Sequence, residues 1–400
     1  MKKISILVIA LLLIFSFVAC KNEPLTPKKV WDGTANTEWY DESKTEYTIS
    51  SEEDFAGFAK LVNEGKTFEG KKVMLSADID LDNKPWTPIG HASESVYELN
   101  SKNELANIYK SKDTEFKLFA GEFDGQNHKV CNLVIDKTGK ANEFIAVALF
   151  GVIKNGSTIK NLTIENANVK GDYFTATLLG YVPEENTPTT KKTIIENISL
   201  QGDITVYGFA SSGGMIGRNE VKTVLEVKNS KINASAKSSV SLIDNGLMVG
   251  GLIGAAYGQD TLIENCSSNI NVTGNVQVVG GLAGHMQDGT INKSVVSGNI
   301  KLIPDKTATK TNWGYDQYGI GAYIGTVDNT AIDTTVNDKA PVATSNKISI
   351  TNCTSTAKID TKVYDGEPLF FKGLVGTIRN TKAKSTYNSV DAKNIVTITE

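Results

Sequence analysis

The sequence is poor in the residues that most often carry catalysis, metal binding and nucleic-acid binding. It contains 3 histidines, 4 cysteines and 9 prolines among 400 residues. The formal net charge is -4, and the 41 lysines and arginines form no basic block, whereas a nucleic-acid interface needs clustered cations. No Cys-x-x-Cys pair or group of histidines has the spacing of a zinc site. We therefore expect no nucleic-acid partner, no metal and no other cofactor.

Glycine, by contrast, is abundant. The chain has 35 glycines, and 40% of its residues are hydrophobic, which is enough to build a core. Many glycines, few prolines and no collagen or coiled-coil period are typical of a β-rich chain with many turns. The composition therefore predicts an all-β fold.

One long apolar run is present, near the N-terminus. Residues 4–18 are almost entirely apolar and follow a basic start. The run is short for a membrane span and is typical of a secretory leader. The junction FVAC, which ends at Cys20, resembles a bacterial lipobox, although its phenylalanine stands where leucine is usual. This resemblance implies a signal peptide over residues 1–19 and lipid on Cys20, with an uncleaved N-terminal anchor as the open alternative.

Lipid on Cys20 would make the membrane a partner of this protein. Two or three acyl chains give stable anchoring, since a single chain binds only marginally. The next residue is Lys21, not the Asp that resembles an inner-membrane retention signal in some bacteria. We therefore expect a lipid-anchored protein of the bacterial cell surface, in the outer membrane.

A polar tether and a single helix are expected next. Residues 20–47 are polar, and residues 48–140 read as an N-terminal cap with entry coils. Ser50 and Glu53 have capping-box spacing, apolar residues follow at helical spacing, and Gly65 ends the pattern. An isolated amphipathic helix before a long β region can cover the open end of a sheet stack. We expect that role for this helix.

A short motif recurs from about residue 147 onward. It reads ALFG, TLLG, GMIG, GLIG, GLAG, AYIG and GLVG, and its closing glycines are Gly151, Gly180, Gly217, Gly254, Gly284, Gly325 and Gly376. The intervals between these glycines are 29, 37, 37, 30, 41 and 51 residues. A constant motif at unequal intervals indicates insertions in the loops of a regular scaffold.

A second block recurs between copies of that motif. Its first apolar residues, which we assign to one inward slot, are Val130, Ile159, Ile195, Val227, Ile263, Ile291 and Ile350. Two residues later stand Asn132, Asn161, Asn197, Asn229, Asn265 and Asn352, with Lys293 in the remaining copy. The next residue is inward again, so the chain must bend at the asparagine, which tolerates left-handed backbone and can stack on its neighbours. These features predict a parallel β-solenoid of about ten coils.

The closing motif resembles the Glug repeat of bacterial surface proteins. The upstream segments ADIDLDNKPWTPIG and FAGEFDGQNHKVCNLVI are similar to the region that precedes such repeats, and the likeness covers residues 30 to about 380. The resemblance implies a right-handed parallel β-helix over residues 141–400, displayed on the cell surface and adhesin-like. The family brings no agreed catalytic residues, so none are assigned.

The glycine-rich motif could instead hold a phosphate. The stretch GGLIGAAYGQDT has no lysine in register, and the motif occurs seven times, so we interpret its glycines as sites of close coil packing.

The cysteines and the acidic run also have structural interpretations. Cys266 and Cys353 replace Leu or Ile at inward positions and should be buried, whereas Cys131 should point outward. The acidic residues of ADIDLDN lack the glycine and glutamate of a calcium loop, and we expect a solvated strand face there.

A polysaccharide lyase or glycosidase is the alternative function, because such enzymes also use β-helices. That chemistry needs two close carboxylates in a groove. Glu196 and Glu264 would share one wall, but lysines alternate with them, which favours charge neutralisation along a sheet. The best candidate ligand loop is WGYDQYG, with Trp313, Tyr315 and Tyr318 in the longest insertion, and a loop-anchoring aromatic cluster is the competing interpretation. We expect no enzyme activity, and adhesin-like binding of host, matrix or glycan ligands.

Overall fold

The computed structural model contains strands from Glu46 to Thr399. It describes residues 30–93, 115–140, 143–233, 240–244, 248–274, 278–302, 318–328 and 347–360, and the strand segments 369–370, 375–379, 386–390, 393–394 and 397–399. Within these ranges no helix is long and apolar enough to cross a membrane. The fold is almost entirely β, with long parallel sheets, as the composition predicts.

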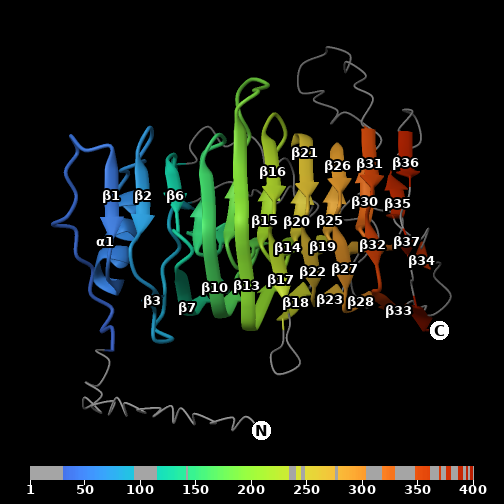
Figure 1. Ribbon diagram of the computed structural model, residues 1–400, viewed down its shortest axis with the longest axis horizontal. Coiled ribbons are helices and arrows are strands. Elements are labelled where there is room, and N and C mark those ends of the chain that lie inside the picture. Colours follow the sequence, from blue (N-terminus) through green and yellow to red (C-terminus); the bar gives the residue numbers. More distant parts are fainter. Residues whose placement is uncertain are drawn as a thin grey trace, which may run out of the picture. The chain divides into compact units, whose positions relative to one another are not determined.

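The largest sheet contains three columns of parallel strands, joined where a strand runs through more than one column (Figure 1). The first column contains β1 (Glu46–Ile49), β2 (Lys72–Leu75), β6 (Glu122–Asp124), β10 (Thr158–Lys170), β13 (Lys192–Gly208), β16 (Val224–Lys228), β21 (Gln259–Glu264), β26 (Gly289–Asn292), β31 (Lys347–Thr351) and β36 (Thr386–Val390). The second contains β3 (Ile79–Asp80), β7 (Lys129–Asp136), β17 (Lys231–Asn233), β22 (Ser267–Asn269), β27 (Val295–Ser297), β32 (Thr354–Ser355) and β37 (Lys393–Asn394). The third contains β18 (Val240–Asp244), β23 (Asn271–Gly274), β28 (Asn299–Leu302), β33 (Lys358–Asp360) and β38 (Thr397–Thr399).

Two further parallel sheets hold the two sides of the glycine-rich motif. One contains β8 (Ala146–Val147), β11 (Phe174–Thr175), β14 (Ser211–Gly213), β19 (Met248–Gly250), β24 (Val278–Gly280), β29 (Tyr318–Gly321) and β34 (Leu369–Phe370). The other contains β9 (Phe150–Val152), β12 (Leu179–Val182), β15 (Ile216–Asn219), β20 (Ile253–Ala256), β25 (Ala283–Met286), β30 (Ile324–Asp328) and β35 (Val375–Arg379). A small antiparallel pair, β4 (His91–Ser93) and β5 (Glu115–Lys117), completes the β structure of the described residues.

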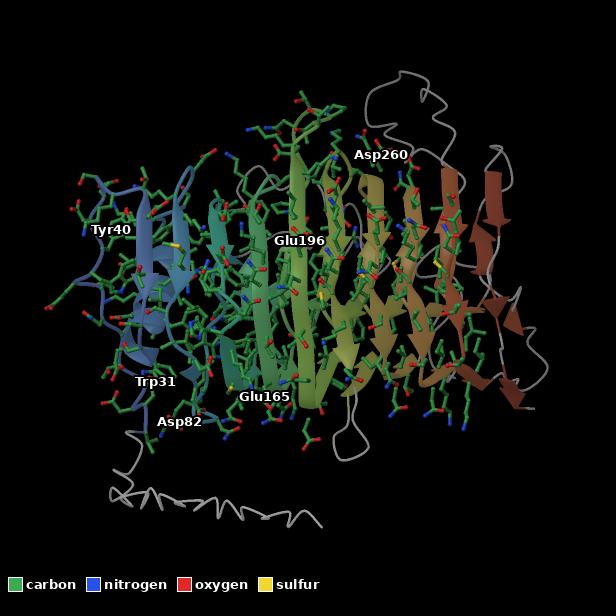
Figure 2. All side chains as sticks on the ribbon, in the orientation of Figure 1. Trp31, Tyr40, Asp82, Glu165, Glu196 and Asp260 are labelled. Atoms are coloured by element: carbon green, nitrogen blue, oxygen red, sulfur yellow. The ribbon has the colours of Figure 1, made fainter. Side chains whose placement is uncertain are left out.

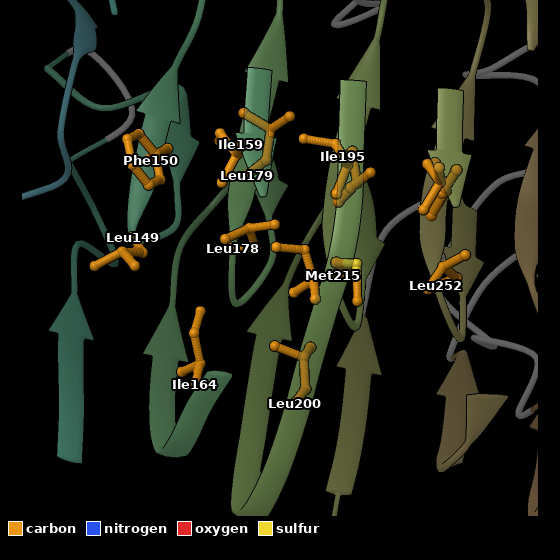
Figure 3. Close-up of a cluster of buried hydrophobic side chains, with 14 of the residues drawn as sticks. Leu149, Phe150, Ile159, Ile164, Leu178, Leu179, Ile195, Leu200, Met215 and Leu252 are labelled. Carbon is orange, nitrogen blue, oxygen red and sulfur yellow. The ribbon is translucent and has the colours of Figure 1, made fainter. Parts of the chain in front are cut away.

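The predicted repeat register of the glycine-rich motif is confirmed. Its third residues pair in one continuous ladder, Phe150, Leu179, Ile216, Ile253, Ala283, Ile324 and Val375. The residues before them, such as Leu178, Met215 and Leu252, are fully buried and stack from coil to coil (Figure 3). The closing glycines are needed for this approach, because a Cβ on Gly254 would lie 2.6 Å from the main-chain oxygen of Gly217 on the preceding coil.

The residues that we assigned to one inward slot of the second block do share one ladder, except the first of them, Val130. The observed ladder runs through Tyr47, Val73, Phe123, Ile159, Ile195, Val227, Ile263, Ile291 and Ile350. Val130 is not in it, because Val130 pairs with Ile79 and Ile164 in the second column. The apolar-x-Asn pattern occurs at two bends of one coil, since Asn132 and Asn166 are left-handed like Asn161. Sequence similarity alone therefore matched two different bends.

The one helix, α1 (Glu52–Asn63), begins one residue later than the capping-box prediction. The N-cap is Ser51, whose hydroxyl accepts a hydrogen bond from the Asp54 amide at 3.1 Å. Ser50 instead bonds to the Asp54 carboxylate, so the predicted Ser50–Glu53 box is wrong. Gly65, with φ of 98°, follows the helix end as predicted.

The apolar face of α1 packs against side chains of the first coils. The Phe58 ring stacks on Phe123 with centroids 5.9 Å apart, and the Phe55 ring stacks on Trp86 at 5.0 Å. Upstream of the helix, Trp31 is only 4% exposed and its main-chain N–H donates to Asp82 at 2.7 Å. Trp31 is therefore packed against the first coils, although it lies within the stretch 20–47 that we expected to be a tether.

Candidate ligand-binding site

A polar pocket lies where four successive strands of the first column begin. Its volume is about 460 Å³, and its lining includes Thr45, Glu46, Lys71, Lys72, Glu122 and Thr158, at or just before the starts of β1, β2, β6 and β10. The chain reaches these strands through tight turns at Gly70 and Gly156, whose φ values of 71° and 96° favour glycine. These residues lie as far as 113 positions apart in the sequence, and we did not predict the pocket.

Main-chain hydrogen bonds between coils run along this corner. The amide of Lys72 donates to the Thr45 carbonyl at 2.8 Å, and the amide of Glu122 donates to the Lys71 carbonyl at 3.0 Å. The amide of Thr158 continues the series to the Gly121 carbonyl at 3.1 Å. Glu46, Lys72, Glu122 and Thr158 pair in one row across the strands. Successive side chains of this row are therefore about 4.8 Å apart at the backbone.

An ion network holds the centre of the row. The Lys72 ammonium lies 3.4 Å from both the Glu122 and the Asp124 carboxylates, and the Lys160 ammonium lies 2.9 Å from Glu122. Burial opposes the charge of Asp124, but hydrogen bonds from Asn161, the Gln126 amide and Lys72 outweigh it and hold the pKa of this carboxyl below its ordinary value. Burial also opposes the charge of Lys72, but its hydrogen bonds to Asp124 and Glu122 and their negative charges outweigh burial and raise the pKa of this ammonium.

Other polar groups of the pocket are uncommitted. Among the described residues, no group bonds to the Glu46 carboxylate or to the hydroxyls of Thr45 and Thr158. Lys71, by contrast, donates to two main-chain carbonyls, those of Glu42 at 2.8 Å and Lys44 at 2.5 Å. The pocket thus combines two ammonium groups, two carboxylates and two free hydroxyls, with no net formal charge.

The sequence-predicted site residues are not brought together by the described structure. Cys20, Trp313 and Tyr315 lie outside the described residues. Tyr318 is the first residue of β29, and its backbone pairs with Leu369 of β34. The proposed aromatic ligand loop therefore stays a prediction.

The charged row that motivated the enzyme alternative has the alternating order that we predicted. Lys160, Glu196, Lys228 and Glu264 pair in sequence across β10, β13, β16 and β21. Glu196 marks this row on β13 in Figure 2. Glu196 thus has a lysine on both neighbouring strands, whereas Glu264 has Lys228 on one side and Asn292 on the other. This arrangement neutralises charge along the sheet and separates the two glutamates by two strand spacings.

The cysteines are placed largely as expected. Cys266 is 2% exposed and Cys353 is fully buried, which confirms the inward slot. Burial raises the pKa of Cys266 to about 12. Cys131 is half-buried rather than exposed, with its Sγ 4.0 Å from Glu165, and burial together with that carboxylate raises its pKa to about 11. All three thiols therefore stay protonated at neutral pH and are poor nucleophiles.

The acidic strand face of residues 78–82 is only partly solvated, contrary to our prediction. Asp78 is exposed, but its carboxylate accepts from the Lys129 amide at 3.0 Å and lies 3.1 Å from the His128 ring nitrogen. Asp80 accepts from the side chain of Asn132 at 2.7 Å. These oxygens are used to join neighbouring coils.

A buried cation was also missed by the sequence analysis. Arg218 is 4% exposed, its Nε lies 2.5 Å from Glu220, and its guanidinium lies over the rings of Phe174 and Tyr257 at 5.0 and 4.4 Å. Arg218 directly follows Gly217, the closing glycine of the motif. Its side chain points away from the apolar core but is still covered, here by the two aromatic rings. Arg218 therefore contributes to packing rather than to an open surface.

Comparison with known proteins supports the fold. No family model matches the chain. Over 207 residues, 51% of this chain, the sequence is 29% identical to halomucin from Haloquadratum walsbyi, and the match spans only 2% of that much longer protein. The structure is similar, with a TM-score of 0.51 and 19% identity, to a Bacteroides ovatus protein whose assignment as an immunoglobulin A1 protease is itself provisional. That likeness covers 90% of this chain and 84% of the other.

The fold class follows from this likeness and from the parallel ladders. The chain has a parallel β-helix-like fold. A second structure, an IgA1 protease, has a TM-score of 0.48 and 16% identity, and the match covers 88% of this chain and 21% of that one. The likeness to the Bacteroides ovatus protein, at 19% identity, shows the fold alone.

Proposed function

We propose that this chain is a bacterial surface lipoprotein of the Glug-repeat type. Lipid on Cys20 anchors it in the outer membrane, α1 caps the first coil, and a right-handed β-helix displays binding sites to the exterior. Its activity is adhesin-like, the binding of host, matrix or glycan ligands. Phe55 and Phe58 support the capping role, because both rings are fully buried against the first coils.

One observation supports binding more than any other, the polar corner pocket. The pocket is open to ligand and contains the unbonded Glu46 carboxylate and the unbonded Thr158 hydroxyl. The core beneath the sheet, by contrast, is a continuous apolar stack. A scaffold with a uniform core and a local polar recess is suited to presenting a site.

A polysaccharide-active enzyme is the second candidate, and the same pocket favours it. Glu46 and Glu122 both line it, on strands two spacings apart, and glycosidases act through two carboxyl groups in one cleft. However, Glu122 is already bonded to Lys160, and Lys72 lies between the two acids. We do not extend the protease assignments of the structural neighbours to this chain, because only the fold is shared.

Metabolic labelling with a radioactive fatty acid tests the anchor. The full chain should be labelled, and the Cys20→Ser variant should lose the label, because the thiol is the acyl acceptor. Labelling of both proteins to the same extent would refute lipidation at Cys20. Analysis of released reducing sugars after incubation with polysaccharides tests the enzyme alternative, which requires products in excess of a heat-inactivated control.

A further inference from the structure

We propose that the corner pocket binds a neutral saccharide segment. This inference rests on the proposed binding function and names its ligand class. The volume of about 460 Å³ lies in the range of small-molecule sites, about 300–1,000 Å³. The site is formed by the starts of β1, β2, β6 and β10.

The charges of the pocket exclude ligands of one sign. A simple anion would meet Glu46 and Glu122 as well as the two lysines, and a simple cation would meet Lys71 and Lys72. In either case the ligand would be repelled by the pocket groups of its own sign, and removing its charge from water would cost further free energy. A ligand without net charge avoids both penalties.

The hydrogen-bonding groups match those of sugar hydroxyls. Each ring hydroxyl both donates and accepts, so it can donate to the Glu46 carboxylate and accept from the Lys72 ammonium. The hydroxyls of Thr45 and Thr158 can each donate or accept a hydrogen bond. Glu46, Lys72 and Glu122 follow one another across the strands, so acceptor, donor and acceptor recur at about 4.8 Å. A chain of sugar rings lying across the strands meets them in succession.

The glycines of the corner keep the recess accessible. A Cβ built on Gly70 has no heavy atom within 4 Å, so the space beside this turn is open. The Cβ position of Gly121, by contrast, lies 2.5 and 2.6 Å from the main-chain oxygens of Phe68 and Lys71, so this glycine is needed for close packing of the backbone. Main-chain hydrogen bonds between coils hold the lining residues at the strand starts, so the backbone of the site is preorganised for its ligand.

A glycan array tests this proposal with two pairs of matched variants of the full chain. Thr158→Tyr places a ring in the pocket, whereas Thr290→Tyr makes the same change in the same outward row on β26, outside the pocket. Glu46→Gln removes the unbonded carboxylate, and Glu38→Gln removes an exposed one outside the lining. The array carries neutral oligosaccharides and, as a second set, uronate- and sialate-containing ones.

The expected result is binding of the wild-type chain to one or more neutral oligosaccharides. Thr158→Tyr and Glu46→Gln should weaken that binding at least tenfold, whereas Thr290→Tyr and Glu38→Gln should leave it within twofold. Circular dichroism melts of all four variants check that the fold is retained, and Glu46→Gln is decisive if Thr158→Tyr fails to fold. Binding restricted to the acidic set would overturn the proposal.

Failure of this inference is distinguishable from failure of the proposed function. If the wild-type chain binds ligands and both pocket variants bind as well as their controls, the saccharide pocket is refuted while surface binding stands. The opposite outcome is also informative. If the purified pocket variants lose glycan binding, but the chain is neither labelled with fatty acid nor exposed on cells, the saccharide pocket stands and the display function fails.

Discussion

At the scale of single residues, left-handed asparagines fix where each coil bends. Asn161, Asn197, Asn229 and Asn265 all have φ between 51° and 55°. The Asn197 amide donates to the Asn161 side chain at 2.9 Å, and the Asn265 amide donates to Asn229 at 2.8 Å. The asparagine thus tolerates the backbone and joins one coil to the next, which is why it recurs at this bend.

Lys293 interrupts this asparagine ladder and provides a test of its contribution. It has the same left-handed backbone, with φ of 49°, but its ammonium cannot accept a hydrogen bond, and the Asn352 amide donates to Asn292 instead, at 3.0 Å. Asparagine tolerates left-handed backbone better than lysine, so Lys293→Asn should stabilise the protein by about 1 kcal/mol, measured by denaturant unfolding. The control is Lys231→Asn, on an exposed strand position without left-handed backbone. Equal stability of the two variants would contradict a role for the ladder.

Residue patterns predicted the bends but not every register. The left-handed asparagines and the buried cysteine positions were evident from the sequence, because a fixed role selects a fixed residue type. Val130 was assigned to the wrong column because two bends of one coil carry the same short pattern, and Asn132 is as left-handed as Asn161. Periodicity identifies which residues point inward, but only strand pairing identifies which column they occupy.

At the scale of elements, charged side chains join neighbouring strands of the first column. Glu226 of β16 is 6% exposed and lies between the ammonium groups of Lys192 and Lys228. Burial alone would raise the pKa of this carboxyl, but the hydrogen bonds from the two lysines outweigh it, so the pKa lies below its ordinary value. The ionised form is therefore the one that stabilises the folded strands.

Acid should weaken this link between β13 and β16. Because the folded-state pKa of Glu226 is lowered, its contribution is complete above the unfolded value of about 4.3 and is lost as the pH falls through the folded value. Glu226→Gln should cost about 1.5 kcal/mol in the free energy of unfolding at pH 7, because the partly exposed Lys192 and Lys228 stay hydrated without their partner. The difference from wild type should shrink as the pH falls from 5 toward 3, measured by urea unfolding at each pH. The exposed control, Glu38→Gln, should show no such dependence, and a constant difference for Glu226→Gln would contradict this account.

At the scale of the whole molecule, the repeat determines the fold, whereas the pocket is formed by residues outside the repeat motif. The sevenfold glycine-rich motif predicted parallel stacking, and its pairing is observed from Phe150 to Val375. The pocket was not predicted, because Glu46, Lys72, Glu122 and Thr158 belong to four coils and share no motif. They come together only through the register of the first column. A repeat sequence thus predicts the scaffold, whereas the binding site is identified only once the register of the strands is known.

Adhesion of intact cells tests most directly the claim that this β-helix is displayed for binding. Cells producing the full chain are applied to surfaces coated with oligosaccharides or extracellular matrix proteins, beside cells producing Cys20→Ser at equal levels. We predict that wild-type cells adhere to at least one coating and that Cys20→Ser lowers adhesion at least tenfold, because the protein is no longer anchored. Equal adhesion by the two strains, or no adhesion above cells lacking the protein, would contradict the account.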